Sequence, residues 1–141
     1  MGTREIAEQL GKVPLFSGLS KRELEATVRA GKEVSHRAGH VIAREGDRGV
    51  GFFLILDGEA RVSRGGKGLS HLQAGDFFGE ISLLDRGPRT ATVTATTDIH
   101  LLGVTAWVFR GLLTEYPSIA LKLLEVVTAR LRKVMKGPLD A

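Results

Sequence analysis

The chain has 141 residues, of which 43% are hydrophobic and 26% are charged. This balance is typical of one soluble globular domain and excludes a disordered or collagenous chain. There is no cysteine, which excludes disulfides, thiolate metal ligands and a thiol nucleophile. The net charge of +4 is concentrated in residues 117–136, where five basic residues stand against one acid. We interpret this charge as complementing the negative end of a helix dipole, with contact to nucleic acid or anionic lipid as the alternative.

The sequence carries no sign of membrane insertion or secretion. No apolar run approaches the roughly 18 residues that a membrane span needs. The N-terminal ten residues contain two glutamates and lack the apolar core of a secretory signal. We therefore expect a cytoplasmic protein without a membrane span.

Residues from about 3 to 31 are expected to be helical. Ser20 and Glu23 have the spacing of a capping box at the start of one helix. Gly31 follows the last apolar position of that helix, where a left-handed glycine is expected to end it. Residues 14–19 form an apolar turn between two short helices.

Residues from about 32 to 104 consist of short runs of strand-forming residues separated by glycine-containing turns, a pattern typical of a β-sandwich or barrel. The pair Asp57-Gly58 lies between two such runs and predicts a β-hairpin. Residues 52–56 are apolar at every position. We therefore expect flanking helices to cover the outer face of this strand.

Residues from about 105 to 136 are expected to form two helices. Thr105 is placed to cap the first, and Pro117 suits the first turn of the second. The second helix has apolar residues at heptad spacing, at Ala120, Leu124, Val127, Leu131 and Val134. We expect its first half to pack on the strands and its second half to meet a partner or act as a lid. The row spans only about two heptads, so it permits a homodimer without requiring one.

One segment, residues 77–93, departs from the strand pattern. Residues 80–84 are expected to form a short helix that begins after Gly79, and the N–H groups of a first helical turn attract anions. In the strand that follows, Arg89 has the same parity as the apolar residues Ala91 and Val93, so its side chain is expected to point inward. A buried guanidinium needs an anionic partner. A phosphate fits this requirement, and an internal ion pair with Glu80 is the alternative.

Two stretches of this segment, FGEISLL at 78–84 and PRTATV at 88–93, resemble the phosphate-binding cassette of cyclic-nucleotide-binding domains. That family includes kinase regulatory subunits, catabolite activator proteins and gated channels, and the similarity spans about residues 13–135. The resemblance implies an eight-stranded, jelly-roll-like β-roll flanked by helices. It also implies that residues 1–141 form a single domain that binds one cyclic nucleotide.

The resemblance assigns roles to individual residues. It implies that Arg89 pairs with the cyclic phosphate and that Glu80 accepts the ribose 2′-hydroxyl. It places backbone groups of Gly79, Ile81 and Ser82, together with the Thr90 hydroxyl, around the nucleotide. The candidates for the base pocket and its lid are Val62, Arg130, Leu131 and Val134. In this family a hydroxyl residue at the position of Thr90 occurs in domains that bind guanine and in domains that prefer adenine, so Thr90 alone does not identify the base. We favour cyclic AMP over cyclic GMP.

No motif of an enzyme is present, and we expect none of the chain's residues to be catalytic. The four histidines (His36, His40, His71 and His100) lack metal-binding spacing, so we expect no metal. A cupin-like metalloenzyme and a ligand-free interaction module are the alternatives. Only five residues follow Lys136, so no DNA-binding domain is expected. The expected function is a stand-alone sensor or an excised regulatory fragment whose C-terminal helix moves on ligand binding and signals to an unknown protein partner.

Overall fold

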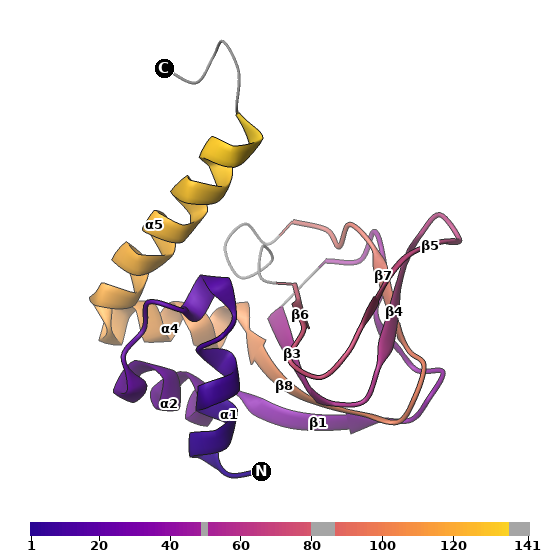
Figure 1. The fold of residues 1–141 in the computed structure, drawn as a ribbon, viewed down its shortest axis with the longest axis horizontal. Coiled ribbons are helices and arrows are strands. Elements are labelled where there is room, and N and C mark those ends of the chain that lie inside the picture. Colours follow the sequence, from indigo (N-terminus) through magenta and orange to yellow (C-terminus); the bar gives the residue numbers. More distant parts are fainter. Residues whose placement is uncertain (49–50, 80–86, 136–141) are drawn as a thin grey trace.

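The computed structural model describes residues 1–48, 51–79 and 87–135. Helices gather on one side of a roll of eight strands (Figure 1). The strands form two four-stranded antiparallel sheets with the orders β1-β8-β3-β6 and β2-β7-β4-β5. In chain order the elements are α1 (Thr3–Leu10), η1 (Pro14–Phe16), α2 (Lys21–Ala30), β1 (Lys32–His36), β2 (Val41–Ala43), β3 (Gly51–Asp57), β4 (Ala60–Arg64), β5 (Lys67–Leu72), β6 (Phe77–Phe78), β7 (Thr92–Ala95), β8 (Ile99–Thr105), α4 (Ala106–Glu115) and α5 (Pro117–Val134). The β-roll with flanking helices is therefore confirmed.

The capping box of α2 is confirmed, but the predicted left-handed end of this helix is wrong. The Glu23 N–H donates to Ser20 Oγ at 3.1 Å, and the Ser20 N–H donates to Glu23 Oε1 at 2.7 Å. Gly31 has φ −81° and ψ −178°, which is extended backbone, and the chain runs directly into β1. A Cβ at Gly31 would lie only 2.9 Å from the carbonyl oxygen of Gly103. The glycine is therefore needed for close approach to β8 and not for a turn.

The hairpin predicted at Asp57-Gly58 is also wrong. Strand β3 pairs with β8 and β6, whereas β4 pairs with β7 and β5, so the chain passes from one sheet to the other at this turn. Gly58 has φ +97°, and a Cβ there would overlap the carbonyl oxygen of Asp98. The two-residue hairpin lies instead between β4 and β5, where Gly65 and Gly66 have φ +57° and +80°.

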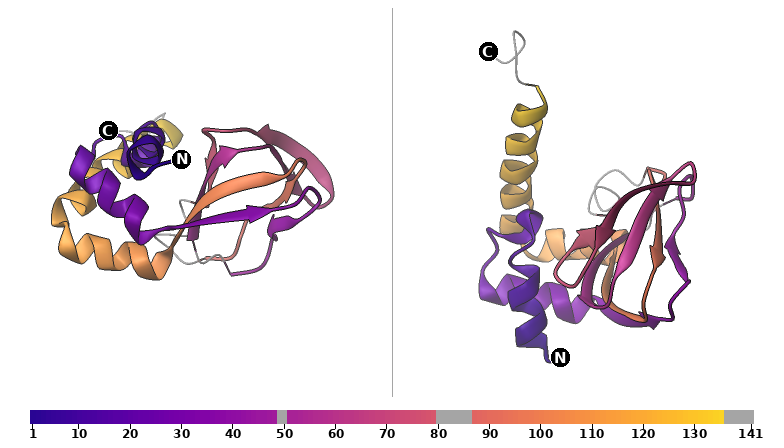
Figure 2. Two further views of the ribbon diagram at one scale, coloured as in Figure 1. Left: turned by 90° about the horizontal axis from the view of Figure 1, so that it is seen from below. Right: turned by 45° about the vertical axis from the view of Figure 1, so that its right-hand side comes forward.

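Strand β3 contributes to two separate apolar clusters, as its sequence of apolar residues requires. Phe52, Leu54 and Leu56 pack with residues of the helices, and Ile55 packs inside the roll. The ring of Phe52 lies 5.2 Å from that of Phe16 in η1, centroid to centroid. The expectation that helices cover the outer face of this strand is confirmed, and both views of Figure 2 show the helices on that side of the roll.

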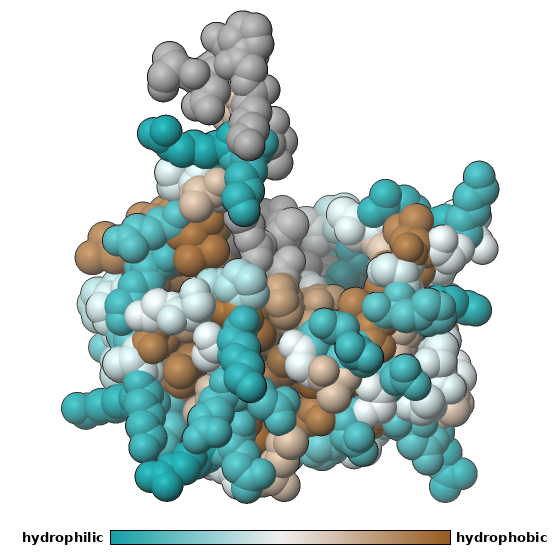
Figure 3. Space-filling model, in the orientation of Figure 1, coloured by the Kyte–Doolittle hydropathy of each residue, from teal (hydrophilic) through white to brown (hydrophobic). Residues whose placement is uncertain are grey.

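The two halves of α5 have different surroundings. Ile119 and Leu123 are buried in the cluster that the helices form, where α5 contacts η1 and α4. The same cluster contains Phe52 and Leu54 of β3, so this half of α5 lies in the apolar core that the helices share with the strands. Farther along, Leu124 is 63% exposed and Leu131 is 54% exposed. This half rises away from the roll and shows hydrophobic surface among polar side chains (Figure 3).

A charged contact fixes the first turns of α5 to α2. Glu23 is only 6% exposed. Its carboxylate accepts hydrogen bonds from Ser118 Oγ and, at 2.9 Å, from Lys122 Nζ. Burial alone raises the pKa of Glu23, but the hydrogen bonds from Lys122, Ser118 and Ser20 outweigh it and lower that pKa to about 2.

The remaining expectations about the helices are local ones. The Val108 N–H donates to Thr105 Oγ1 at 3.2 Å, which confirms the predicted cap of α4. Pro117 occupies the first turn of α5, as predicted. Among the described residues, no helix is long and apolar enough to cross a membrane.

Candidate functional site

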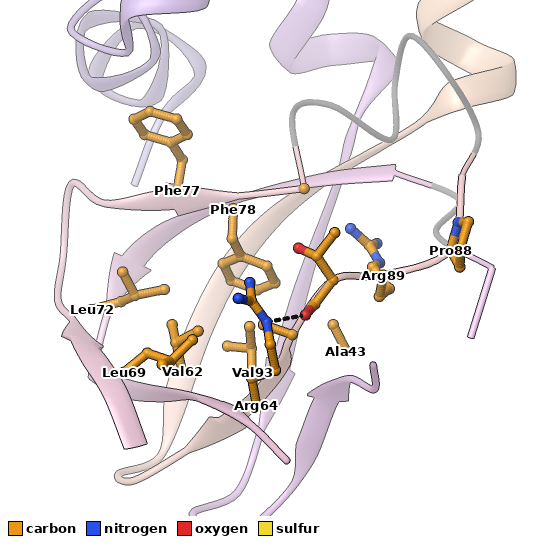
Figure 4. Close-up of a pocket in the computed structure, with 13 residues that line it drawn as sticks. Ala43, Val62, Arg64, Leu69, Leu72, Phe77, Phe78, Pro88, Arg89 and Val93 are labelled. Atoms are coloured by element: carbon orange, nitrogen blue, oxygen red, sulfur yellow. Dashed lines mark hydrogen bonds between the residues drawn. The ribbon is translucent and has the colours of Figure 1, made fainter. Parts of the chain in front are cut away.

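A cavity of about 320 Å³ opens between the two sheets at one end of the roll. Its volume lies within the range of about 300–1,000 Å³ that is typical of ligand sites. Four residues predicted from the sequence line it, namely Val62, Gly79, Arg89 and Thr90. The other described lining residues are Ala43, Arg64, Leu69, Leu72, Phe77, Phe78, Pro88, Ala91 and Val93 (Figure 4).

Arg89 is the half-buried cation of this cavity. Its Nη2 donates to the carbonyl oxygen of Gly51 at 2.9 Å. Its guanidinium carbon lies 6.0 Å from the centre of the Phe53 ring, at the limit of a cation–π contact. Phe53 stacks in turn on Phe78, at 5.2 Å between ring centres. Burial lowers the pKa of Arg89, but a guanidinium stays charged at neutral pH.

The backbone around Arg89 is held by two hydrogen bonds to the loop after β2. The Arg89 N–H donates to the Asp47 carbonyl at 2.7 Å, and the Gly46 N–H donates to the Arg89 carbonyl at 2.9 Å. Val93 and Ala95, which share the parity of Arg89, are buried inside the roll. The strand predicted at Arg89 begins only at Thr92, and residues 90 and 91 form a bend, so Arg89, Thr90 and Ala91 all line the cavity whatever their parity.

The backbone of Gly79 lies close to the Arg89 guanidinium. It has φ +84°, a conformation that side chains other than glycine rarely adopt. A Cβ at this position would overlap the Arg89 guanidinium and lie 2.5 Å from the Gly51 oxygen. Glycine therefore lets the backbone and the cation come together at one wall of the cavity.

Several predicted residues cannot be compared with the structure. Glu80, Ile81 and Ser82 lie outside the described residues, as do the side chains of Arg130 and Val134. Leu131 is exposed on α5 and does not line the cavity. The ribose contact and the helical lid thus stay predictions.

Several residues of the cavity wall, among them Arg64 and Leu69, were not predicted from the sequence. Val62 and Arg64 share their parity on β4 with the buried Ala60, and this alternation could have placed Arg64 at the cavity. Leu69 lies at a register shift between β4 and β5, where a bulge re-aims a side chain. No sequence signal of such a bulge was available.

None of the four histidines is among the described residues that line the cavity. The rings of His36 and His40 stack with 4.0 Å between their centres. Burial, and to a lesser extent His40, lower the pKa of His36. His100 Nε2 contacts Glu33 Oε1 at 2.8 Å. Within residues 1–48, 51–79 and 87–135, no three histidines or acids are grouped so that they could hold a metal ion.

The family model described as the cyclic nucleotide-binding domain matches residues 33–116, which include every described residue of the cavity wall. The chain belongs to this family. The cyclic nucleotide-binding domain is a regulatory module and not a catalytic one.

Individual relatives agree with this assignment. The chain is 42% identical over 93 residues to a cAMP-dependent protein kinase regulatory subunit of Schizosaccharomyces pombe, covering 65% of this chain and 23% of that protein. Among solved structures, the N-terminal domain of a transcriptional regulator from Streptomyces coelicolor A3(2) is 31% identical, with a TM-score of 0.85 over 89% of this chain and 92% of that one. The regulatory domain of Toxoplasma gondii PKA, crystallised with cAMP, is 28% identical, with a TM-score of 0.72 over 78% of this chain and 44% of that one.

The described residues of the cavity fit a nucleotide. Val62, Leu69 and Leu72 form an apolar wall suited to a base, and Figure 4 shows them together on one side of the cavity. Arg89 supplies a cation suited to a phosphate. The cavity therefore offers separate surfaces to the two chemically different ends of such a ligand.

Proposed function

We propose that this chain binds a cyclic nucleotide in the cavity and that Arg89 pairs with its phosphate. The observation that carries the proposal is the position of the Arg89 guanidinium, which is half-buried against Gly79 at the wall of a ligand-sized cavity. A guanidinium matches two oxygens of a phosphate with parallel hydrogen bonds. Such a pair offsets the cost of keeping this cation away from bulk water.

The remaining contacts follow from the cassette that the sequence resembles. Glu80 accepts a hydrogen bond from the ribose 2′-hydroxyl, and the Thr90 hydroxyl lies beside the phosphate. Backbone groups of Gly79, Ile81 and Ser82 complete the binding of the phosphate and sugar. Several charge-assisted hydrogen bonds of about 1.5–3 kcal/mol each are sufficient for micromolar affinity, close to −8 kcal/mol.

The ligand that we propose is cyclic AMP in preference to cyclic GMP. Support comes from the Schizosaccharomyces relative, which is named for cAMP, and from the Toxoplasma domain, which was crystallised with it. The base packs on the wall that contains Val62. No metal ion takes part in this binding.

We further propose that ligand binding moves the second half of α5 and so signals to a partner. Arg130, Leu131 and Val134 then cover the base, because the nucleotide adds a surface on which these residues can pack. The exposed apolar row that includes Leu124 and Val127 is the surface offered to a downstream protein or to a second copy of the chain. Sedimentation velocity with and without nucleotide tests whether two copies of the chain associate through this surface.

Isothermal titration calorimetry with cyclic AMP and cyclic GMP tests the assignment of Arg89. We expect the Arg89→Ala variant to bind at least tenfold more weakly than the wild type, because one charge-assisted contact contributes more than about 1.4 kcal/mol. Arg110→Ala is the matched control, since this exposed arginine on α4 lies outside the cavity. Equal affinity in the wild type and Arg89→Ala would refute the phosphate contact.

A further inference from the structure

Arg64 is a second arginine of the cavity wall, and its side chain is held in place. It extends from the end of β4 toward the segment that carries Arg89, and its Nε donates to the Thr90 carbonyl oxygen at 2.8 Å (Figure 4). An exposed arginine at a strand end ordinarily extends into water, because fixing its side chain costs conformational entropy. Here the hydrogen bond keeps the guanidinium at the cavity.

The bond to Thr90 uses only one edge of the guanidinium. With Nε bound to a carbonyl, the two terminal nitrogens remain at the far edge of the planar group as a pair of donors. A guanidinium has five N–H donors and no acceptor. The pair can therefore bind only to acceptor atoms of a ligand.

The place of Arg64 along β4 indicates which part of a nucleotide it meets. Val62 precedes it by two residues on the same face of the strand, and both side chains line the cavity. Leu69 of the neighbouring strand lines the cavity beside them. A base that packs on this apolar wall presents its edge to Arg64, while Arg89 is left for the phosphate.

Purine bases differ at this edge. Guanine offers two acceptors, O6 and N7, which match a pair of arginine donors, whereas adenine offers the N7 acceptor beside an N6 amino donor. We propose that Arg64 hydrogen-bonds to the O6/N7 edge of guanine and so gives the cavity affinity for cyclic GMP in addition to cyclic AMP. This inference depends on the nucleotide binding proposed above.

The test uses three ligands on one set of variants. Cyclic IMP has the O6 and N7 atoms of cyclic GMP but lacks its 2-amino group, so it separates the Arg64 contact from any contact to that amino group. Calorimetry on Arg64→Ala is expected to show at least a fivefold loss of affinity for cyclic GMP and cyclic IMP, which is roughly the lower limit for a bidentate arginine–guanine pair. The affinity for cyclic AMP is expected to change less than twofold.

Two further variants serve as controls. Arg64→Lys keeps the charge but not the paired donors, so it is expected to lose affinity for cyclic GMP and cyclic IMP as Arg64→Ala does. Arg61→Ala removes an exposed arginine of the same strand that lies outside the cavity, and it is expected to bind all three ligands as the wild type does. Thermal unfolding of each variant verifies that it is folded.

Two results would overturn the inference while leaving the proposed function intact. If Arg64→Ala lost the same amount of affinity for all three ligands, Arg64 would only hold the Thr90 backbone or contact the phosphate. Unchanged binding of all three would mean that it contacts no ligand. If the wild type bound none of the nucleotides, the proposed function itself would fail.

Discussion

The two faces of strand β3 show how the molecule separates stability from binding. The face with Phe52, Leu54 and Leu56 is filled by large side chains of the helices. The side chains of the opposite face, Phe53 and Ile55, pack inside the roll. One strand thus supports a close-packed core on one side. On its other side Phe53 stacks on Phe78, which lines the cavity, because side chains alternate along a strand.

Side-chain size explains why only one of these faces leaves a cavity. The cavity wall includes the small residues Ala43, Gly79 and Ala91, whereas most members of the helical cluster are larger apolar residues such as phenylalanine and leucine. Small residues on facing strands leave space that large ones would fill. Substitutions on the helical face should therefore lower stability, and substitutions on the inner face should mainly lower ligand affinity.

The largest effect is expected from Phe52→Ala. The side chain is fully buried between Phe16 and Phe77, and its removal should lower the free energy of unfolding by about 3–5 kcal/mol. Urea unfolding measures this loss. At temperatures where the variant is folded, its affinity for cyclic AMP should stay within a factor of three of the wild type. A loss of ligand affinity without a loss of stability would contradict the separation of the two faces.

A comparable effect is expected from the contact between α2 and α5. The hydrogen bonds from Lys122, Ser118 and Ser20 hold the pKa of Glu23 at about 2 in the folded chain, below the 4.5 of an unperturbed glutamate. The unfolded chain therefore takes up a proton first, and this part of the stability is fully present above pH 4.5 and is lost as the pH falls toward 2. The loss is on the order of 3 kcal/mol.

Urea unfolding of the wild type and Glu23→Gln at several pH values measures this contribution. The variant should be less stable than the wild type at neutral pH, and the difference should shrink as the pH falls. Glu115→Gln, which changes an exposed glutamate at the end of α4, is the matched control. A difference that does not depend on pH would show that the Glu23 carboxylate is not the source of the stability.

A smaller effect on stability, with a larger one on binding, is expected from Gly79→Ala. The positive φ of Gly79 should cost the alanine variant about 1–2 kcal/mol of stability. Because the Cβ would also displace Arg89, affinity for cyclic AMP should fall at least tenfold. Gly39→Ala carries the same kind of strain at φ +90° with no atom within 4 Å, so it should bind normally. Equal binding by both variants would contradict the role of Gly79.

The sequence was sufficient to predict features that depend on residues close together in the chain. The capping box at Ser20 and the cap at Thr105 are both set by spacing along one element. The roll itself followed from the density of short strands and from the resemblance of residues 78–93 to a known cassette.

The features that failed, or were missed, depend on distant parts of the chain. The Asp57-Gly58 turn carries no signal of which sheet the next strand joins, and Gly31 is required by its contact with Gly103 of β8. Leu69 reaches the cavity through a register shift between two strands. The alternation along β4 could have placed Arg64 on the cavity side, but its hydrogen bond to the distant Thr90 carbonyl, which fixes the guanidinium, has no sequence signal.

The most direct test of the account is a crystal structure of this chain with cyclic AMP. We predict that a phosphate oxygen lies within hydrogen-bonding distance of the Arg89 guanidinium and that the base packs on the wall formed by Val62 and Leu72. A nucleotide bound outside the roll, or one inside it whose phosphate is remote from Arg89, would contradict the account.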